Sequence, residues 1–382
     1  MEKKKYIALV IKTEGLEYDD RVRKEILTIQ KLFPNISFKI FAMLPENKET
    51  EGVTGYGIPY KTVYVPSRDK YPSGRKALLK SYEFYKVIKD DLNDYDAIWC
   101  ANTDTSIAVL LATKTHLLWD LHELPNRFIE TWCRRMVLRY LFSRCKVVVH
   151  ANPQRCDYLK EIGAIDNKAK HYVIRNYPNF EDIDTEYNDL YYEFMKWKGN
   201  RPCVYLQGLQ GTDRAAYESI MAVLRENDLT AVVVGTVNQA SKQKIITEVG
   251  SDEVNSRIFF AGKIPQLKIP QYVKECMMTL VFYKNTEPNN VFCEANRFYQ
   301  SVIMGLPVVT GCNPSMKELI DKYHFGVATG DYGENIDSIV DAIHEIRSNY
   351  NYFKDNNLKY RNKLLWSQQE PNIKEIITSL FS

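Results

Sequence analysis

Short runs of β-branched and other apolar residues alternate with longer amphipathic segments along most of the chain. The runs are typical of buried strands, and the amphipathic segments have helical spacing. The first set of expected strands covers residues 6–12, 37–44, 62–65, 97–101, 117–121, 147–151 and 172–174. The expected helices between them cover residues 20–32, 74–90, 126–143 and 153–162, with one more starting at Asp104. This alternation implies right-handed crossovers and a parallel sheet covered by helices on both faces.

The alternation stops between Phe180 and Arg201, where the chain is polar, acid-rich and aromatic and has no strand pattern. It then resumes, with expected strands at 203–207, 230–234, 258–261, 278–283, 307–310 and 326–328 and helices at 214–225 and 242–249. We therefore expect an α/β protein of two doubly wound, Rossmann-like parallel-sheet domains. Ligands of such sheets bind outside the carboxyl ends of the strands, so two crevices are expected to face each other across a cleft. That geometry suits an enzyme that joins two substrates.

The composition supports two globular cores and argues against nucleic-acid binding. The chain has 382 residues, of which 45% are hydrophobic and 26% charged, enough for two cores. The 51 basic and 48 acidic residues leave a net charge of +3, which is too small for a phosphate-neutralising surface. The charge is uneven, because residues 1–182 hold 30 basic and 24 acidic residues and the remainder holds 21 and 24. Functional basic character is therefore expected to be local.

The cysteines and the hydropathy pattern bear on the compartment. None of the eight cysteines stands in a C-x-x-C pair, and no Cys/His cluster has zinc spacing, so we expect reduced thiols. No apolar run approaches the roughly 20 residues that span a bilayer, and the first residues lack a signal-peptide core. We expect a soluble intracellular protein.

The glycines exclude the common nucleotide signatures. A dinucleotide-binding loop needs G-x-G-x-x-G after a strand, so that the backbone approaches a pyrophosphate at a helix N-terminus. Gly15 alone follows the first strand, and Gly208 and Gly211 follow the strand at 203–207 without a third glycine. No G-x-x-x-x-G-K-[ST] loop is found either. Dinucleotide-dependent oxidation and ATP hydrolysis are therefore disfavoured.

The most informative segment is a short helix expected from Glu294 to Met304. Gly305 ends this helix, because glycine accepts the left-handed C-terminal position, and a strand begins at Pro307. The polar first turn carries a partial positive charge, and Arg297 adds a full one, so a diphosphate can bind there. The alternative is a helix whose arginine and glutamine are simply solvated.

This segment resembles the donor-sugar helix of the GT-B glycosyltransferases, in particular the large retaining group called family 4. The family pattern is P-N-K-(hydrophobic)-(aromatic)-E-(x)4-G-L-P-V-V/I, and the matching residues here are Ala295-Asn296-Arg297-Phe298-Tyr299-Gln300 and Gly305-Leu306-Pro307-Val308-Val309. Arg297 replaces the lysine, and Gln300 replaces the second glutamate of the E-x7-E motif. The first glutamate falls on Phe292, and Glu294 is the nearest carboxylate.

Four further segments resemble the family in the expected order. Residues 205–214 are similar to its strand-loop-helix segment, whose last basic residue, here Arg214, grips the donor diphosphate. Residues 119–125 resemble its D-x-H-(E/D) segment, which implies a position for His122 near the donor sugar. Residues 20–25 resemble its first helix, and residues 173–178 its V-I-x-N-x-P turn. For Arg214 and His122 the alternatives are a surface arginine and a histidine satisfied at a strand end.

The resemblance implies the domain organisation and the site. Residues 1–182 form an N-terminal acceptor-side domain, 183–360 a C-terminal nucleotide-sugar donor domain, and 361–382 a tail that crosses back to the first domain. The implied catalytic residues are His122 and Arg214. The implied donor-binding residues are Gly15, Gly208, Glu294, Asn296, Arg297 and Gln300. No metal and no cofactor besides the nucleotide-sugar substrate are expected, since no D-x-D stands in a site-like context; the one at 94–96 is interpreted as a helix-to-strand turn. Gly15 has the alternative of a simple turn.

We therefore expect a retaining, hexosyltransferase-like glycosyltransferase that acts on a nucleotide-diphosphate sugar and a glycan or lipid-linked acceptor, in bacterial surface polysaccharide synthesis. A GT-B sugar-nucleotide epimerase and a non-catalytic glycosyltransferase-like binding protein remain alternatives. The expected location is cytoplasmic. The basic segment 126–146 interleaves cations with Phe128, Trp132, Leu138 and Leu141, which fits peripheral contact with an anionic membrane at its inner face. The more frequent alternative is a helix that packs its apolar stripe on its own sheet and leaves a solvated basic face.

Overall fold

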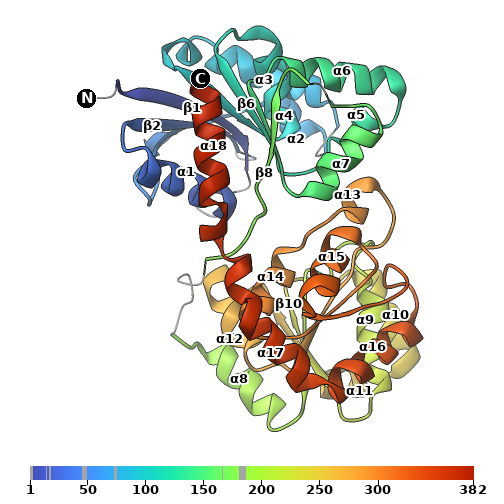
Figure 1. Cartoon of the computed structure of the whole chain (residues 1–382). Helices are drawn as coiled ribbons and strands as arrows, with labels where there is room; N and C mark the ends of the chain where they lie inside the picture. The colour runs from blue at the N-terminus through green and yellow to red at the C-terminus, as the bar shows by residue number, and fades with distance from the viewer. Residues whose placement is uncertain are drawn as a thin grey trace. The chain divides into compact units, whose positions relative to one another are not determined.

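The computed structural model describes residues 3–13, 15–16, 19–44, 50–72, 75–165, 167–179 and 186–382. These residues form two compact units (Figure 1). Unit 1 comprises Met1–Asn176 and Gln369–Ser382, and unit 2 comprises Tyr177–Gln368. The expected boundary at residue 182 falls within residues 180–185, outside the described part of the chain.

Unit 1 contains an 8-stranded sheet among its described residues. Its strands are β1 (Lys5–Lys12), β2 (Ile36–Met43), β3 (Glu51–Val53), β4 (Pro59–Val63), β5 (Ala97–Ala101), β6 (His116–Leu121), β7 (Val147–His150) and β8 (Lys170–Val173). Their order is β3-β4-β2-β1-β5-β6-β7-β8, and each pairing is parallel except β3 with β4. The antiparallel edge strand β3 was not expected from the sequence. The order reverses between β1 and β5, so the switch point of unit 1 lies at their carboxyl ends.

The helices of unit 1 cover both faces of its sheet. They are α1 (Asp20–Leu32), α2 (Pro66–Lys70), α3 (Ala77–Ile88), α4 (Thr103–Ala112), α5 (Asn126–Ile129), α6 (Trp132–Ser143), α7 (Pro153–Glu161) and the C-terminal α18 (Glu370–Phe381). Right-handed crossovers that run in opposite directions along a sheet place their helices on opposite faces. Helix α1 therefore covers one face together with α18, which contacts α1 and strands β6, β7 and β8, while α3, α4 and α6 cover the other (Figure 1).

Unit 2 contains a 6-stranded parallel sheet among its described residues, in the order β11-β10-β9-β12-β13-β14. Its strands are β9 (Cys203–Gln207), β10 (Thr230–Val234), β11 (Ile258–Gly262), β12 (Met278–Val281), β13 (Val308–Thr310) and β14 (Gly326–Ala328). Its helices are α8 (Asp189–Lys198), α9 (Ala216–Arg225), α10 (Gln239–Val249), α11 (Ser251–Arg257), α12 (Ile269–Val273), α13 (Pro288–Val291), α14 (Asn296–Ile303), α15 (Pro314–Tyr323), α16 (Ile336–Ser348) and α17 (Tyr350–Tyr360). The order reverses between β9 and β12, which defines the switch point of this unit.

The hydrophobic pattern predicted most elements to within a few residues. Helix 20–32 and strands 97–101, 203–207, 230–234 and 326–328 have their expected bounds. In α1 the local chemistry is clear, because the Asp19 carboxylate accepts from the backbone N–H of Val22 and Asp20 stands in the first turn, both favourable at a helix N-terminus.

One local expectation was wrong. The single helix expected at 126–143 is two helices, because Thr131 takes extended backbone angles and its side chain accepts from the N–H of Arg134 to begin α6. The segment 180–201, which has no strand pattern in the sequence, contains α8 and no strand among its described residues. Asn188 caps that helix by accepting from the N–H of Tyr191, and the aromatic side chains Tyr191 and Phe194 are buried in the core of unit 2. In both places a side-chain cap sets the helix start.

No helix in the described part of the chain is long and apolar enough to cross a bilayer.

Candidate functional site

The first cluster of predicted site residues lies at the switch point of unit 2. Strand β9 ends at Gln207 and is followed by Gly208, and β12 ends at Val281 and is followed by Phe282 and Tyr283. The two strands are parallel neighbours, so their carboxyl ends open at the same edge of the sheet. This is the position where doubly wound sheets bind ligands.

Gly208 lies against the guanidinium of Arg297. Its φ is +68°, in the region that favours glycine, and a Cβ built on it would lie 2.7 Å from Arg297 Nη1. Only glycine satisfies both conditions without movement. The close approach of the backbone to the Arg297 guanidinium therefore depends on glycine at position 208.

Arg297 is buried with no carboxylate partner. It lies in the first turn of α14, is only 7% exposed and donates from Nη2 to the carbonyl of Phe282 at 3.3 Å. Its Nε has no hydrogen-bond partner, and no ion pair reaches it, among the described residues. A buried cation without an anion is unfavourable. The arrangement therefore favours an anionic ligand at this position.

Tyr283 brings a second arginine to the same place. The guanidinium carbon of Arg214 lies 3.9 Å from the centroid of the Tyr283 ring, and that of Arg297 lies 5.0 Å from it. Burial raises the pKa of Tyr283 to about 12, although Arg297 acts in the opposite direction, so the phenol stays neutral. Arg214 pairs with Asp213 at 3.3 Å and is 28% exposed. Two guanidinium groups thus converge on one neutral ring, and we call Arg214, Tyr283 and Arg297 the arginine cluster.

Asn313 organises the loops around this cluster. It is fully buried, and its Nδ2 donates to the carbonyl of Tyr283 at 3.1 Å and to that of Asn290 at 3.1 Å. These bonds tie the loop after β13 to the loop after β12. Sequence reasoning missed both Tyr283 and Asn313. Tyr283 ends the expected strand 278–283, and Asn313 follows the expected strand 307–310, which is the only signal of either residue.

Helix α14 departs in part from its expected form. It begins at Asn296, two residues later than expected, because Ala295 takes extended angles at the N-cap without a side-chain cap. It ends as expected, with Met304 at the C-cap and Gly305 at a φ of +80°. Asn296 is exposed and Gln300 half-buried.

Glu294 is held by its own helix. Its carboxylate accepts a hydrogen bond from the hydroxyl of Tyr299, one turn into α14. This hydrogen bond goes to a residue outside the arginine cluster. Of the predicted donor-binding residues, the structure brings Gly208 and Arg297 together, and Arg214 joins them through the ring of Tyr283.

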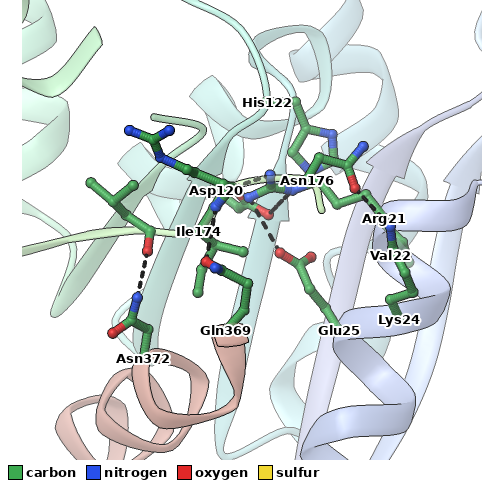
Figure 2. A network of polar contacts seen from close by, with 12 residues as sticks. Arg21, Val22, Lys24, Glu25, Asp120, His122, Ile174, Asn176, Gln369 and Asn372 are labelled. Carbon is green, nitrogen blue, oxygen red and sulfur yellow. Dashed lines mark hydrogen bonds and ion pairs between the residues drawn. The ribbon is translucent and has the colours of Figure 1, made fainter. Parts of the chain in front are cut away.

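A second cluster lies within unit 1, around His122. This residue directly follows β6, and its Nε2 lies 3.0 Å from Oδ2 of Asp120, the next-to-last residue of that strand (Figure 2). Arg21 of α1 donates to the same carboxylate, from Nη2 to Oδ1 at 2.9 Å and from Nε to Oδ2 at 3.4 Å. The Arg21 guanidinium therefore binds both oxygens of Asp120 through two hydrogen bonds, the bidentate geometry that makes arginine–carboxylate pairs strong.

Burial and the nearby charges, above all that of Arg21, determine the protonation states of the carboxyl groups and the imidazole in this network. Burial disfavours the charged form of Asp120, but Arg21 and then His122 outweigh it and lower the pKa of that carboxyl. Burial likewise disfavours a charged imidazole, but Asp120 outweighs it and raises the pKa of His122. Glu25 lies 3.2 Å from Arg21, yet burial raises its pKa to about 8. At neutral pH the network therefore holds an ionised Asp120 and a protonated Glu25.

Glu25, Asp120 and His122 each offer a ligand atom, all within 4.8 Å of one another. A divalent metal prefers such carboxylate and imidazole donors. Here, however, the guanidinium of Arg21 already occupies both oxygens of Asp120, so these residues do not fit a metal. We interpret the cluster as an ion-pair network that orients His122.

The same network holds the end of β8 and the tail of the chain. Arg21 Nη1 donates to the carbonyl of Ile174 at 2.9 Å. Gln369 accepts from the N–H of Arg175 at 3.1 Å, and Asn372 donates to the carbonyl of Val173 at 3.2 Å (Figure 2). The two chain segments that connect the units thus leave unit 1 next to each other.

Gly15 lies in the segment between β1 and α1 of unit 1. It follows β1, which is separated from β6 by β5, and its N–H donates to the Thr13 hydroxyl at 3.3 Å. Of the predicted residues, Gly208, Arg214 and Arg297 thus lie in the cluster of unit 2. His122 and Gly15 lie in unit 1.

Comparisons with known proteins place the fold. No protein-family model matches the chain, and no curated protein matches it in sequence. Among solved structures, the sucrose-phosphate synthase of Thermosynechococcus elongatus superposes with a TM-score of 0.77 at 13% identity, covering 99% of both chains. HepE from Anabaena, solved with UDP and glucose, has a TM-score of 0.69 at 16% identity and covers 98% of this chain and 100% of its own.

The chain has the GT-B fold. A third structure of this fold, the trehalose-6-phosphate synthase OtsA, has a TM-score of 0.73 at 9% identity and covers 98% of both chains. Full-length coverage means that both doubly wound units are shared with the GT-B glycosyltransferases, as the resemblance in sequence implied. Identities this low establish the architecture, while the activity has to be argued from the residues.

Proposed function

We propose that the chain is a glycosyltransferase whose arginine cluster binds the diphosphate of a nucleotide-sugar donor. The observation that carries the proposal is Arg297, a buried guanidinium with an unpartnered Nε and no carboxylate among the described residues. It lies beside Gly208 at the switch point of unit 2, the position where doubly wound sheets bind ligands. Among proteins of the same fold, HepE was solved with UDP-glucose, and the trehalose-6-phosphate enzyme of E. coli with UDP-2-fluoro glucose.

The chemistry of sugar transfer explains why this site needs cations. As the glycosidic bond of the donor breaks, the anomeric carbon becomes oxocarbenium-like and negative charge develops on the departing phosphate. Groups placed in advance around that charge stabilise the transition state more than the ground state. Arg214 and Arg297 offer planar forks that match phosphate oxygens, so they bind the leaving group and neutralise it as it departs.

The finer parts of the proposal concern the acceptor and the setting. We propose a hexose-like sugar, retention of configuration, and a glycan or lipid-linked acceptor in the synthesis of a bacterial surface polysaccharide, with a cytoplasmic location and peripheral contact with a membrane. In this proposal His122 contacts a sugar hydroxyl, and Gly15, Asn296 and Gln300 line the donor site. The oriented imidazole of His122 supports its role, since Asp120 holds one ring nitrogen and leaves the other for a ligand.

The direct test is thermal stabilisation by UDP, GDP and ADP, followed by a transfer screen with the matching nucleotide sugars. At least one nucleotide should raise the melting temperature, and Arg214→Ala should abolish the rise. Arg225→Ala is the matched control, because Arg225 ends α9 on the surface and pairs with Asp337. If no nucleotide stabilises the protein, the donor site is wrong, and conversion of the sugar without any acceptor would instead identify an epimerase.

A further inference from the structure

Arg21 is held at three points inside unit 1. The residue is buried, and each of its three guanidinium nitrogens donates a hydrogen bond. Nε and Nη2 donate to the two oxygens of Asp120, and Nη1 donates to the carbonyl of Ile174 (Figure 2). The carboxylate belongs to β6 and the carbonyl to the segment after β8, so the planar guanidinium is fixed between two elements. Helix α1 therefore sets the position of the Asp120 carboxylate.

Asp120 in turn orients the imidazole of His122. Its Oδ2 lies 3.0 Å from Nε2 of His122. An ionised carboxylate only accepts hydrogen bonds, so Nε2 carries a hydrogen and Nδ1 is the ring nitrogen that remains for a ligand. The imidazole side chain is 18% exposed, whereas Asp120 is 1% exposed. Arg21 therefore acts on His122 through a carboxylate that is itself shielded from solvent.

The charges of this network balance when His122 is neutral. Arg21 is positive, Asp120 is negative, and Glu25 is protonated at neutral pH because burial raises its pKa to about 8. A neutral imidazole therefore leaves the buried network uncharged, and a protonated one leaves it with a single positive charge. Without Arg21 the balance reverses. A neutral imidazole would then leave a buried carboxylate with no cation, which is unfavourable, so His122 would hold its proton more tightly.

Other titratable groups surround the ring in the described part of the chain. Asp19, the N-cap of α1, favours the protonated imidazole of His122. Arg155 of α7 donates to the backbone carbonyl of His122 at 2.7 Å. His150 on the neighbouring strand β7 stays neutral, because burial lowers its pKa to about 3. These groups are the same with and without Arg21, so they do not change the comparison.

We propose that Arg21 is a positioning residue for the transfer reaction: by binding both oxygens of Asp120 it orients His122 through that carboxylate and lets the imidazole release and take up its proton. The part that concerns the reaction rests on the proposed role of His122. The effect of Arg21 on the imidazole is a property of unit 1 and is measured without any substrate. The alternative is a buried ion pair that stabilises the fold and has no influence on the imidazole.

The first test is an NMR titration of the full chain labelled in its six histidines, with His122→Gln to assign the signal of His122. In Arg21→Met this signal should titrate at a higher pH than in the wild type, because the imidazole is then the cation that neutralises Asp120. Arg21→Lys keeps the charge and should titrate close to the wild type. An unchanged or lower midpoint in Arg21→Met overturns the proposal.

Glu25→Gln is the matched control. Glu25 lies 3.2 Å from Arg21 in the same buried network, but the substitution removes no charge while Glu25 is protonated, so the His122 midpoint should stay at its wild-type pH. Equal shifts in Glu25→Gln and Arg21→Met would overturn the proposal, because the ring would then respond to any disturbance of the network.

A second variant covers the case in which Arg21→Met does not fold. Arg21→Met/Asp120→Asn removes both charges of the pair, which a fold tolerates better than the loss of one. Burial lowers the pKa of His122 and Asp120 raises it. The His122 midpoint in the double variant should therefore fall below that of the wild type. An unchanged midpoint overturns the proposal.

Steady-state kinetics connects the imidazole to the reaction. At neutral pH, Arg21→Met should lower kcat about tenfold or more. It should also move the His122 limb of the kcat–pH profile to higher pH, in the same direction as the NMR midpoint, and Arg21→Lys should restore most of the loss. A normal kcat in Arg21→Met, with its NMR midpoint shifted, overturns the positioning role.

The nucleotide-induced rise in melting temperature separates this proposal from the proposed function. Arg21→Met should keep that rise, because the arginine cluster belongs to unit 2. Absence of any nucleotide effect in the wild type overturns the proposed function alone, and the NMR titration still decides whether Arg21 governs His122.

Discussion

Arg297 Nη1 lies 2.7 Å from the point where a Cβ on residue 208 would lie. Because Gly208 has no side chain, it leaves space for the guanidinium of Arg297. It also adopts a backbone conformation with positive φ, which other residues rarely adopt. The two residues are far apart in sequence, and they meet because β9 and β12 are neighbours at the switch point of unit 2.

Gly208→Ala should therefore abolish nucleotide binding. The methyl group displaces Arg297, and the positive φ adds roughly 1 kcal/mol of strain. Thermal shift with and without the nucleotide measures both effects. Gly199→Ala is the control, since Gly199 has a φ of +54° with no atom within 4 Å of the added Cβ; it should show strain with normal binding. Equal loss of binding in both variants would contradict the contact argument.

Arg297→Met should separate stability from function. The variant removes a buried cation that no carboxylate neutralises, so the free energy of unfolding without ligand should rise by about 0.5–2 kcal/mol. Stabilisation by the nucleotide should disappear at the same time. Urea denaturation measures the first effect and thermal shift the second. A fall in unliganded stability would show instead that the guanidinium is a structural group.

Glu25→Gln should flatten the pH dependence of stability. The folded chain holds the Glu25 proton up to a pKa of about 8, whereas the unfolded chain releases it near 4.5. The contribution of Glu25 is therefore complete below pH 4.5 and is lost as the pH rises through 8, with a slope of up to about 1.4 kcal/mol per pH unit.

Urea midpoints across this range test the sign. Glu25→Gln should match the wild type in acid and exceed it in alkali, because the amide stays neutral at every pH. Glu253→Gln removes a half-exposed carboxylate that pairs with Arg257 on α11, and it should not reproduce the effect. A constant offset between Glu25→Gln and wild type would mean that Glu25 is ionised in the folded chain.

His122→Ala should reduce transfer without affecting donor binding. The arginine cluster lies in unit 2 and His122 in unit 1, so the nucleotide-induced thermal shift should be unchanged. If His122 exchanges a proton or a hydrogen bond with a sugar hydroxyl, kcat should fall by about 10²-fold or more. Steady-state kinetics with the best sugar nucleotide measures the loss. A variant with normal kcat would remove His122 from the site.

Ile377→Ala should destabilise unit 1 by about 2–5 kcal/mol. Ile377 of α18 is 2% exposed and lines a small, partly open pocket of about 20 Å³ beside Glu25 and Asp120. Denaturation followed by tryptophan fluorescence measures the effect. Lys374→Ala, on the exposed side of the same helix, is the control and should change stability little. Equal effects would mean that α18 is held by its polar contacts and not by its apolar face.

The sequence predicted the two sheets because strand and helix periodicities are local and strong. The sequence was less informative where a local cap or a sheet edge decides the outcome, as at Thr131 and strand β3. The motif residues Gly208, Arg214 and Arg297 were also found from sequence, through their resemblance to a family. Tyr283, which brings the two arginines together, was not found, because nothing in its neighbourhood distinguishes it from any residue after a strand.

By itself, then, the sequence determined the α/β class and the two doubly wound units, and it predicted residues for binding a diphosphate. Tertiary structure alone decided which charges are buried and which are paired. Arg21 and Asp120 are 99 residues apart yet share two hydrogen bonds, while Arg297 is buried without an anion. Likewise, the sequence showed that α6 is apolar and basic, but only its packing decided that Trp132 is exposed. The reason is physical: periodicity is a property of neighbouring residues, whereas burial and charge pairing depend on which distant segments the sheet order brings together.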